Sequence, residues 1–158
     1  MEDRGSPGIP NGWYAVGWSK DLGVGDVQRI RYFENDMVLF RTRSGVARVL
    51  DAYCPHLGAH LAEGGRVQGE SVRCPFHGWE YDGKSGECAK IPYCARIPAK
   101  ARVRAWDVCE LNHMIFVWHH AEGKAPSWEV PAATQYGDAD WSPVRTFEIE
   151  VPVHIQDM

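Results

Sequence analysis

Two short cysteine–histidine pairs constrain this chain of 158 residues more than any other feature. Cys54 and His56 are separated by one residue, Cys74 and His77 by two, and seventeen residues lie between the pairs. A proline follows each cysteine and a glycine stands shortly after each histidine, so both pairs lie in predicted turns. Each pair offers one thiolate and one imidazole. The sequence therefore predicts a metal centre with two sulfur and two nitrogen ligands.

Two kinds of centre use this ligand set. One is tetrahedral zinc, and the other is a [2Fe–2S] cluster in which two histidines replace two cysteines on one iron. Paired zinc ligands usually have two or more residues between them, and zinc does not require one thiolate and one imidazole from each loop. A cluster with one sulfur-bound and one nitrogen-bound iron does require this symmetry, because each loop must reach both irons. The pattern favours the cluster, held by Cys54, His56, Cys74 and His77, over a zinc-stabilised interaction module.

The formal charges of such a cluster predict where an added electron resides. Two ferric ions, two sulfides and two thiolates sum to zero, so the oxidised centre is neutral and the reduced centre carries one negative charge. Thiolates stabilise the ferric state of their iron, so the electron is expected on the iron held by His56 and His77. The second ring nitrogen of each histidine is left free to hydrogen-bond to an acceptor.

The two loops resemble the cluster-binding loops of Rieske non-haem iron oxygenases in their sequences, which are CPHLGAHL at 54–61 and CPFHGW at 74–79. From residue 10 to residue 158 the chain most resembles the ketosteroid-hydroxylase and cholesterol-desaturase branch of that family. The resemblance implies an all-β, Rieske-type antiparallel β-sandwich or barrel with two cluster-binding loops. It also implies a mononuclear Fe(II) in a catalytic domain beyond this chain, an NAD(P)H-dependent reductase or ferredoxin as electron donor, and a homotrimer of the full-length protein.

The same resemblance implies a low reduction potential. Respiratory Rieske proteins tie their loops together with a disulfide, but Ala59 and Phe76 occupy the matching positions here. Those proteins also have a serine that donates to a sulfide where this chain has Trp79, whereas Tyr81 stands where a tyrosine hydroxyl lies near a ligand sulfur. Rieske potentials span roughly −150 to +300 mV, and the lower end is expected. His60 is interpreted as a neighbour of the centre and not as a further ligand.

Composition and charge narrow the remaining classes. The hydrophobic content of 44% and seven tryptophans predict a folded protein, and a net charge of −4 without a basic stripe gives no indication of nucleic-acid binding. Once Cys54 and Cys74 are assigned to the cluster, three cysteines remain, which are Cys88, Cys94 and Cys109. They are interpreted as reduced thiols, which predicts a cytoplasmic location. The N-terminus does not resemble a secretory signal. The longest apolar run, residues 114–118, is too short to cross a membrane.

Short β-like segments separated by turn signals run to about residue 119, without a convincing helical stripe. The predicted strands are Trp13–Trp18, Val27–Phe33, Met37–Thr42, Val46–Tyr53, Ser71–Cys74, Val103–Leu111 and Met114–His119. The predicted turns lie at 23–26, 35–36, 44–45, 82–86 and 112–113.

Three parts are predicted along the chain: a [2Fe–2S] domain at 1–122, a proline-containing linker at 123–143, and the first strand of a catalytic domain at 144–158. Apolar and polar residues alternate strictly from Phe147 to Ile155, which is typical of a half-buried strand. No two-histidine, one-carboxylate site is recognisable in the chain. We expect these residues to take and give single electrons without turning over substrate. The alternative is a free-standing Rieske ferredoxin, which acts only as a carrier.

Overall fold

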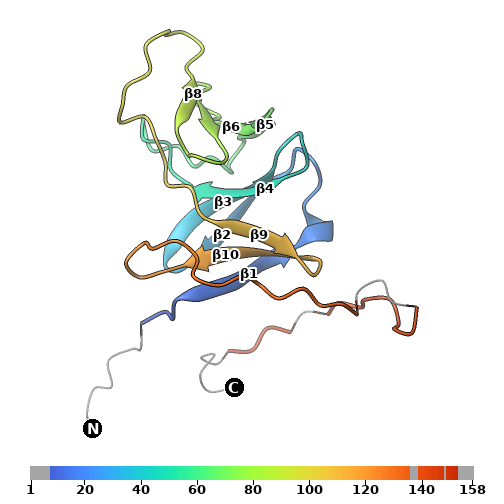
Figure 1. The fold of residues 1–158 in the computed structure, drawn as a ribbon. Helices are drawn as coiled ribbons and strands as arrows, with labels where there is room; N and C mark the ends of the chain where they lie inside the picture. Colours follow the sequence, from blue (N-terminus) through green and yellow to red (C-terminus); the bar gives the residue numbers. More distant parts are fainter. Residues whose placement is uncertain (1–7, 136–138, 148, 153–158) are drawn as a thin grey trace.

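The regular secondary structure of the described part consists almost entirely of short strands, which turns and loops connect (Figure 1). A computed structural model describes residues 8–135, 139–147 and 149–152. Within these residues one 3-10 turn, η1 (Ser19–Asp21), is the only helical element. The strands are β1 (Gly12–Trp18), β2 (Val27–Tyr32), β3 (Asn35–Arg41), β4 (Ala47–Asp51), β5 (Arg66–Gln68), β6 (Ser71–Arg73), β7 (Glu80–Asp82), β8 (Cys88–Lys90), β9 (Val108–Leu111) and β10 (Met114–His119). The all-β prediction is confirmed. No helix that could span a membrane occurs among the described residues.

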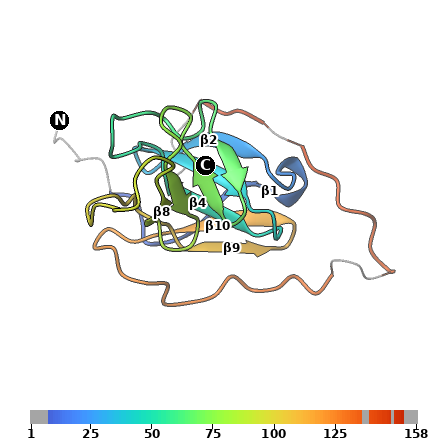
Figure 2. The same ribbon diagram turned by 90° about the horizontal axis from the view of Figure 1, so that it is seen from above.

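The strands form three antiparallel sheets in the orders β1-β10-β9, β2-β3-β4 and β5-β6-β7-β8. Figure 1 shows the β2-β3-β4 sheet between the other two, and Figure 2 shows the arrangement from above. One apolar core lies between the first two sheets, and a second lies between the middle sheet and the β5–β8 sheet. Strand β3 serves both, because Met37, Val38, Leu39 and Phe40 are all buried. Because β3 is covered on both faces, these residues form a continuous apolar run in the sequence.

The first hairpin turn differs from its prediction. The turn was expected at residues 35–36, but Asn35 and Asp36 begin β3. The turn is formed by Phe33 and Glu34, whose φ angles are 54° and 60°, and the Asn35 side chain donates to the Phe33 carbonyl at 2.7 Å. A two-residue hairpin loop needs left-handed backbone, which asparagine and aspartate adopt more readily than phenylalanine, so their preference was misleading. The turn predicted at 112–113 is confirmed.

The structure differs from the predicted strands in two respects: one strand begins later than predicted, and three short strands were not predicted. The predicted strand Val103–Leu111 begins only at Val108. The residues before it bridge two sheets, since the Val103 amide donates to Gly86 and the Trp106 amide donates to Val49. Strands β5, β7 and β8 were not predicted, because three residues are too few to display an alternating pattern.

The segment after β10 is irregular where the structure describes it. Residues 144–147 and 149–152 are assigned to no strand, and the side chains of Phe147 and Ile149 are exposed. The Lys20 ammonium donates to the Thr146 hydroxyl at 2.6 Å, which fixes this segment at one point beside η1. Residues 148 and 153–158, the remainder of the predicted terminal strand, lie outside the described residues.

Candidate metal centre

The two cysteine–histidine loops have the same backbone construction. In each, the cysteine amide donates to the carbonyl five residues later, and the following glycine amide donates back to the cysteine carbonyl. These distances are 2.9 and 2.9 Å for Cys54 and Gly58, and 2.8 and 3.2 Å for Cys74 and Gly78. Both glycines adopt left-handed φ angles, 73° and 72°, which glycine reaches without strain. Each glycine therefore lets its loop fold back on the cysteine.

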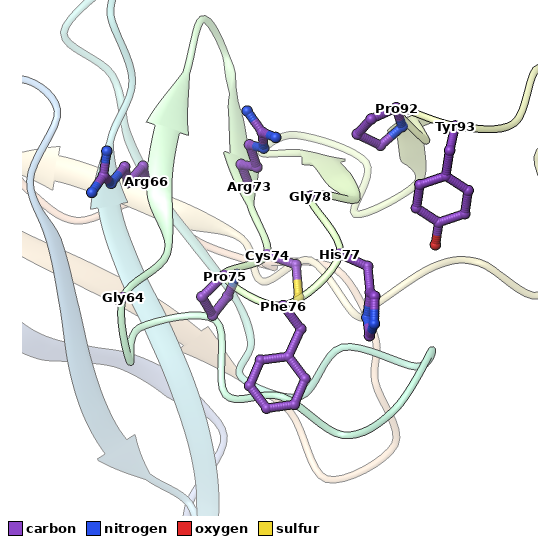
Figure 3. Close-up of a pocket in the computed structure, with 10 residues that line it drawn as sticks. All are labelled: Gly64, Arg66, Arg73, Cys74, Pro75, Phe76, His77, Gly78, Pro92 and Tyr93. Atoms are coloured by element: carbon purple, nitrogen blue, oxygen red, sulfur yellow. The ribbon is translucent and has the colours of Figure 1, made fainter.

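The fold brings the two loops together. The first follows β4 and the second joins β6 to β7, so they leave two sheets that share one core. Cys54 and Cys74 are buried in that core at 2% and 3% exposure. The rings of His56 and His77 are 4.7 Å apart at their centroids and are more accessible. Figure 3 shows Cys74 and His77 projecting from the second loop.

The donor arrangement fits a two-iron cluster. Its sulfur donors lie together in the core and its imidazoles lie together nearer the surface. Within the described ranges, no three His, Cys, Asp or Glu side chains gather closely enough to hold one metal ion. Burial raises the pKa of the Cys74 thiol, and the nearby Cys54 raises it further. A cationic centre would be needed to hold both groups as thiolates.

Aromatic residues surround the candidate ligands. The Tyr81 hydroxyl lies 3.0 Å from Cys54 Sγ, the kind of contact that the family resemblance implies. Burial raises the pKa of Tyr81, and the hydrogen bond to Cys54 adds to this effect, so the phenol stays protonated and would donate to Cys54 once that cysteine is a thiolate. The Trp79 ring stacks on His56 with centroids 4.6 Å apart, and its indole N–H donates to the Tyr93 hydroxyl at 2.7 Å. Tyr93 was not singled out by the sequence, which gives no local signal for this contact.

His60 is oriented by its own loop. Its Nδ1 accepts the Ala62 amide at 3.1 Å, which leaves the ring proton on Nε2 when the imidazole is neutral. That Nε2 is buried, without a hydrogen-bond partner among the described residues. Burial lowers the pKa of His60, and the positive charge of Arg29 lowers it further. The ring also packs edge-on against Tyr53.

Replacing Tyr81 with phenylalanine should lower the reduction potential of the loaded chain by a few tens of millivolts. A donor to sulfur stabilises the more negative, reduced state, and a net hydrogen bond of about 1 kcal/mol corresponds to roughly 40 mV for one electron. The phenyl ring preserves the packing of a fully buried side chain. Protein-film voltammetry measures the shift.

Tyr93→Phe is the matched control, because it removes a nearby hydroxyl that is bonded to Trp79 and not to sulfur. Its potential should stay close to that of the unsubstituted chain. Equal shifts in the Tyr81 and Tyr93 variants would contradict a specific effect of the Tyr81 hydroxyl on the sulfur.

Comparison with known families agrees with this geometry. The family model of the Rieske [2Fe–2S] domain matches residues 12–107, which is more than half of the chain and includes both loops. The match ends just before β9, so it covers the β2-β3-β4 and β5–β8 sheets completely.

Relatives extend the likeness beyond the matched domain. Cholesterol 7-desaturase of Xenopus laevis is 41% identical over 158 residues, which are 100% of this chain and 35% of that protein. A probable 3-ketosteroid-9-alpha-monooxygenase oxygenase component of Rhodococcus rhodochrous is 41% identical over 142 residues, which cover 89% of this chain and 35% of that protein. The chain thus spans about a third of the length of these relatives.

Solved structures show the same fold. Dicamba monooxygenase bound to dicamba superposes with a TM-score of 0.72 at 28% identity, over 82% of this chain and 40% of that one. The resemblance to Rieske non-haem iron oxygenases is confirmed, and with it the cluster as cofactor. This chain belongs to the Rieske [2Fe–2S] domain family.

Proposed function

We propose that Cys54 and Cys74 ligate one iron of the [2Fe–2S] cluster and that His56 and His77 ligate the other. The observation that carries this assignment is the division of the donors into a buried thiol pair and a more accessible imidazole pair on two loops of like construction. When bound, the cluster accepts and releases one electron at a time. The chain would therefore act in electron transfer.

The protein side chains would control access to that electron. Cys54 and Cys74 lie among apolar residues that exclude water, whereas His77 is exposed. The nitrogen-bound iron would be the one closer to a redox partner, since its ligands lie nearer the surface. Trp79, stacked on His56, and Tyr81, bonded to Cys54, would orient both ligands of the first loop.

We further propose that the chain is the N-terminal part of a multicomponent oxygenase. The desaturase and monooxygenase relatives are about three times as long as the stretch they share with it, and dicamba monooxygenase contains non-haem iron. The full protein would hydroxylate or desaturate a hydrophobic, steroid-like substrate at a mononuclear iron beyond this chain. A reductase or ferredoxin would supply the electrons, as the ferredoxin complex of carbazole 1,9a-dioxygenase illustrates. A trimer is part of this proposal.

The proposed domain organisation is a Rieske domain at 1–122, a linker at 123–143 and the start of a catalytic domain at 144–158. Two observations support this division. No strand is assigned after β10 among the described residues, and apolar side chains such as Phe147 are exposed there. Such side chains are expected to be covered in a longer protein. None of the five cysteines, all of them among the described residues, forms a disulfide, which supports the proposed cytoplasmic location.

Electron paramagnetic resonance of the dithionite-reduced chain, with a redox titration, tests the cluster assignment. We expect a one-electron Rieske signal and a midpoint near the lower end of the range, roughly −150 mV. A colourless protein containing zinc would refute the assignment.

For the oxygenase proposal, the full-length protein with a reductase should consume oxygen in the presence of a sterol or steroid ketone. Electron transfer without such consumption would favour a carrier.

A further inference from the structure

The segment after β10 is held against the β1-β10-β9 sheet although it forms no strand. Residues 124–133, called the strap below, are all described and are assigned to no strand. Figure 1 shows this segment running along the lower side of the sheet, away from β5–β8. The strap lies within the predicted linker at 123–143 and contains Pro126 and Pro131. In this part of the linker, side chains of the sheet bind the backbone.

Two tryptophans of the sheet bind the first half of the strap. Trp118 of β10 donates its indole N–H to the Lys124 carbonyl at 2.9 Å. Trp13 of β1 donates in the same way to the Trp128 carbonyl at 2.8 Å. The Trp128 ring packs edge-on against the Trp118 ring, with centroids 5.9 Å apart. Since Trp118 is buried at 4% exposure, release of the strap would leave a buried indole donor without its partner, which is unfavourable.

Asn112 binds the second half of the strap through both ends of its side-chain amide. The amide nitrogen donates to the Pro131 carbonyl at 2.9 Å, and Oδ1 accepts the Ala133 amide at 2.8 Å. An aspartate could not form both bonds, because a carboxylate only accepts. Asn112 lies in the β9–β10 turn with a φ of 54°, which asparagine tolerates better than most residues. The same residue therefore forms the turn and holds the strap.

From these four hydrogen bonds and the tryptophan packing we infer that the strap is a docked part of the Rieske domain, which shortens the tether to the domain that follows. The inference rests on the proposed domain organisation and the proposed electron-transfer function. With the strap docked, at most residues 134–143 separate the two domains. With the strap released, residues 124–143 would separate them, which are twice as many.

The length of the tether determines how often the two domains meet. The effective concentration of one tethered domain at the other falls roughly as the −3/2 power of the tether length, so a doubled tether lowers it roughly threefold. Domains joined by a long linker move relative to each other by default. The docked strap would therefore keep the cluster closer to the mononuclear iron that accepts its electron.

Backbone relaxation of the oxidised, cluster-loaded chain tests whether the strap is docked. Nitrogen-15 order parameters of the non-proline residues in 129–133 should be about 0.85, as in rigid strands. Asn112→Gly removes both side-chain bonds but permits the left-handed φ, so these order parameters should fall below about 0.6. Glu34→Gly is the matched control, because it makes the same change at a φ of 60° in the first hairpin turn and should leave the strap ordered.

Electron transfer within the full-length protein tests the consequence. The cluster is reduced with dithionite and desalted, so that no donor protein takes part. On mixing with oxygen and a steroid ketone, one electron should pass from the cluster to the mononuclear iron, and the paramagnetic signal of the reduced cluster should decay. The decay should be roughly threefold slower in the double variant Asn112→Gly, Trp128→Ala. Its midpoint potential should not change, because neither residue belongs to a cluster loop. Glu34→Gly should decay at the unsubstituted rate.

Two results would overturn the inference. The first is a set of strap order parameters below about 0.6 in the unsubstituted chain. The second is an unchanged decay rate in a double variant whose relaxation shows that the strap is released. Asn112→Gly alone provides the same comparison, with a shorter released segment, where the double variant does not fold. Failure of the proposed function looks different: the unsubstituted full-length protein would keep its reduced-cluster signal on mixing, while the strap order parameters stayed high.

Discussion

Replacing Cys74 with alanine is expected to abolish the cluster and to loosen the β5–β8 sheet while sparing the β1-β10-β9 sheet. The variant should lack visible absorption and contain almost no iron, because three remaining donors leave one iron with a single thiolate. The β5–β8 sheet depends on the cluster, since its strands are three residues long and its core contains both Cys54 and Cys74. Metal binding contributes directly to folding free energy at such sites.

Hydrogen exchange localises that effect. Amides of β6 and β7 should exchange at least about 100-fold faster than in the loaded chain, equivalent to about 2.7 kcal/mol of local stability. Amides of β1 and β10 should change little, because the core between the first two sheets contains no candidate ligand. Equal loss of protection throughout the chain would show that the three sheets unfold as one unit, contrary to this expectation.

Cys88→Ala is the matched control for the cysteine. Cys88 is buried in the same core, but its thiol contacts the Lys90 carbonyl at 3.5 Å and belongs to neither loop. The control should keep its iron and its colour, and lose only the stability expected of a small buried side chain, about 1 kcal/mol. A Cys74 variant that keeps its absorption would remove Cys74 from the ligand set.

Replacing His77 with cysteine is expected to lower the reduction potential strongly. An imidazole is a neutral ligand and a thiolate is anionic, so the substitution adds one negative charge and disfavours the reduced state. Four-thiolate plant-type clusters lie near −400 mV, against about −150 mV at the lower end of the Rieske range. The two kinds of cluster differ by two ligands, and His77→Cys replaces one of them. The substitution should therefore lower the potential by on the order of 100 mV. Protein-film voltammetry with paramagnetic resonance follows both the potential and the signal.

His60→Cys provides the comparison, because it makes the same substitution at a histidine whose Nδ1 is already bonded to the Ala62 amide. Its potential should remain near that of the unsubstituted chain. An unchanged potential in His77→Cys would exclude His77 as a ligand, and a large shift in His60→Cys would implicate His60 in the centre.

The candidate ligands could be predicted from sequence because their signal is local. A cysteine and a histidine must stand within one turn for a single loop to reach both irons, and this requirement is visible at 54–56 and 74–77. The glycines that let the loops turn are equally local. Long strands were predicted for the same reason, since β1, β3 and β10 have enough residues to show their apolar pattern.

The first hairpin turn shows where local preference fails. Asn35 and Asp36 are better turn formers than Phe33, yet the turn lies two residues earlier, at Phe33 and Glu34. Phe33 packs against the rings of Tyr14 and Trp106, which belong to other parts of the chain. Tertiary contacts thus outweigh the conformational preference of single residues, and no window of sequence around the turn contains them.

By itself, the sequence was enough to predict the candidate centre: two loops, their four candidate donors and the all-β class that carries them. Only the tertiary structure decided what surrounds that centre. The Tyr81 hydroxyl reaches Cys54 from 27 residues away, and Lys100 lies beside His56 from another loop. The physical reason is how far apart along the chain the residues that set each property lie. Ligand spacing depends on the reach of one turn, whereas hydrogen bonds and surface charge around a cluster depend on how distant segments pack.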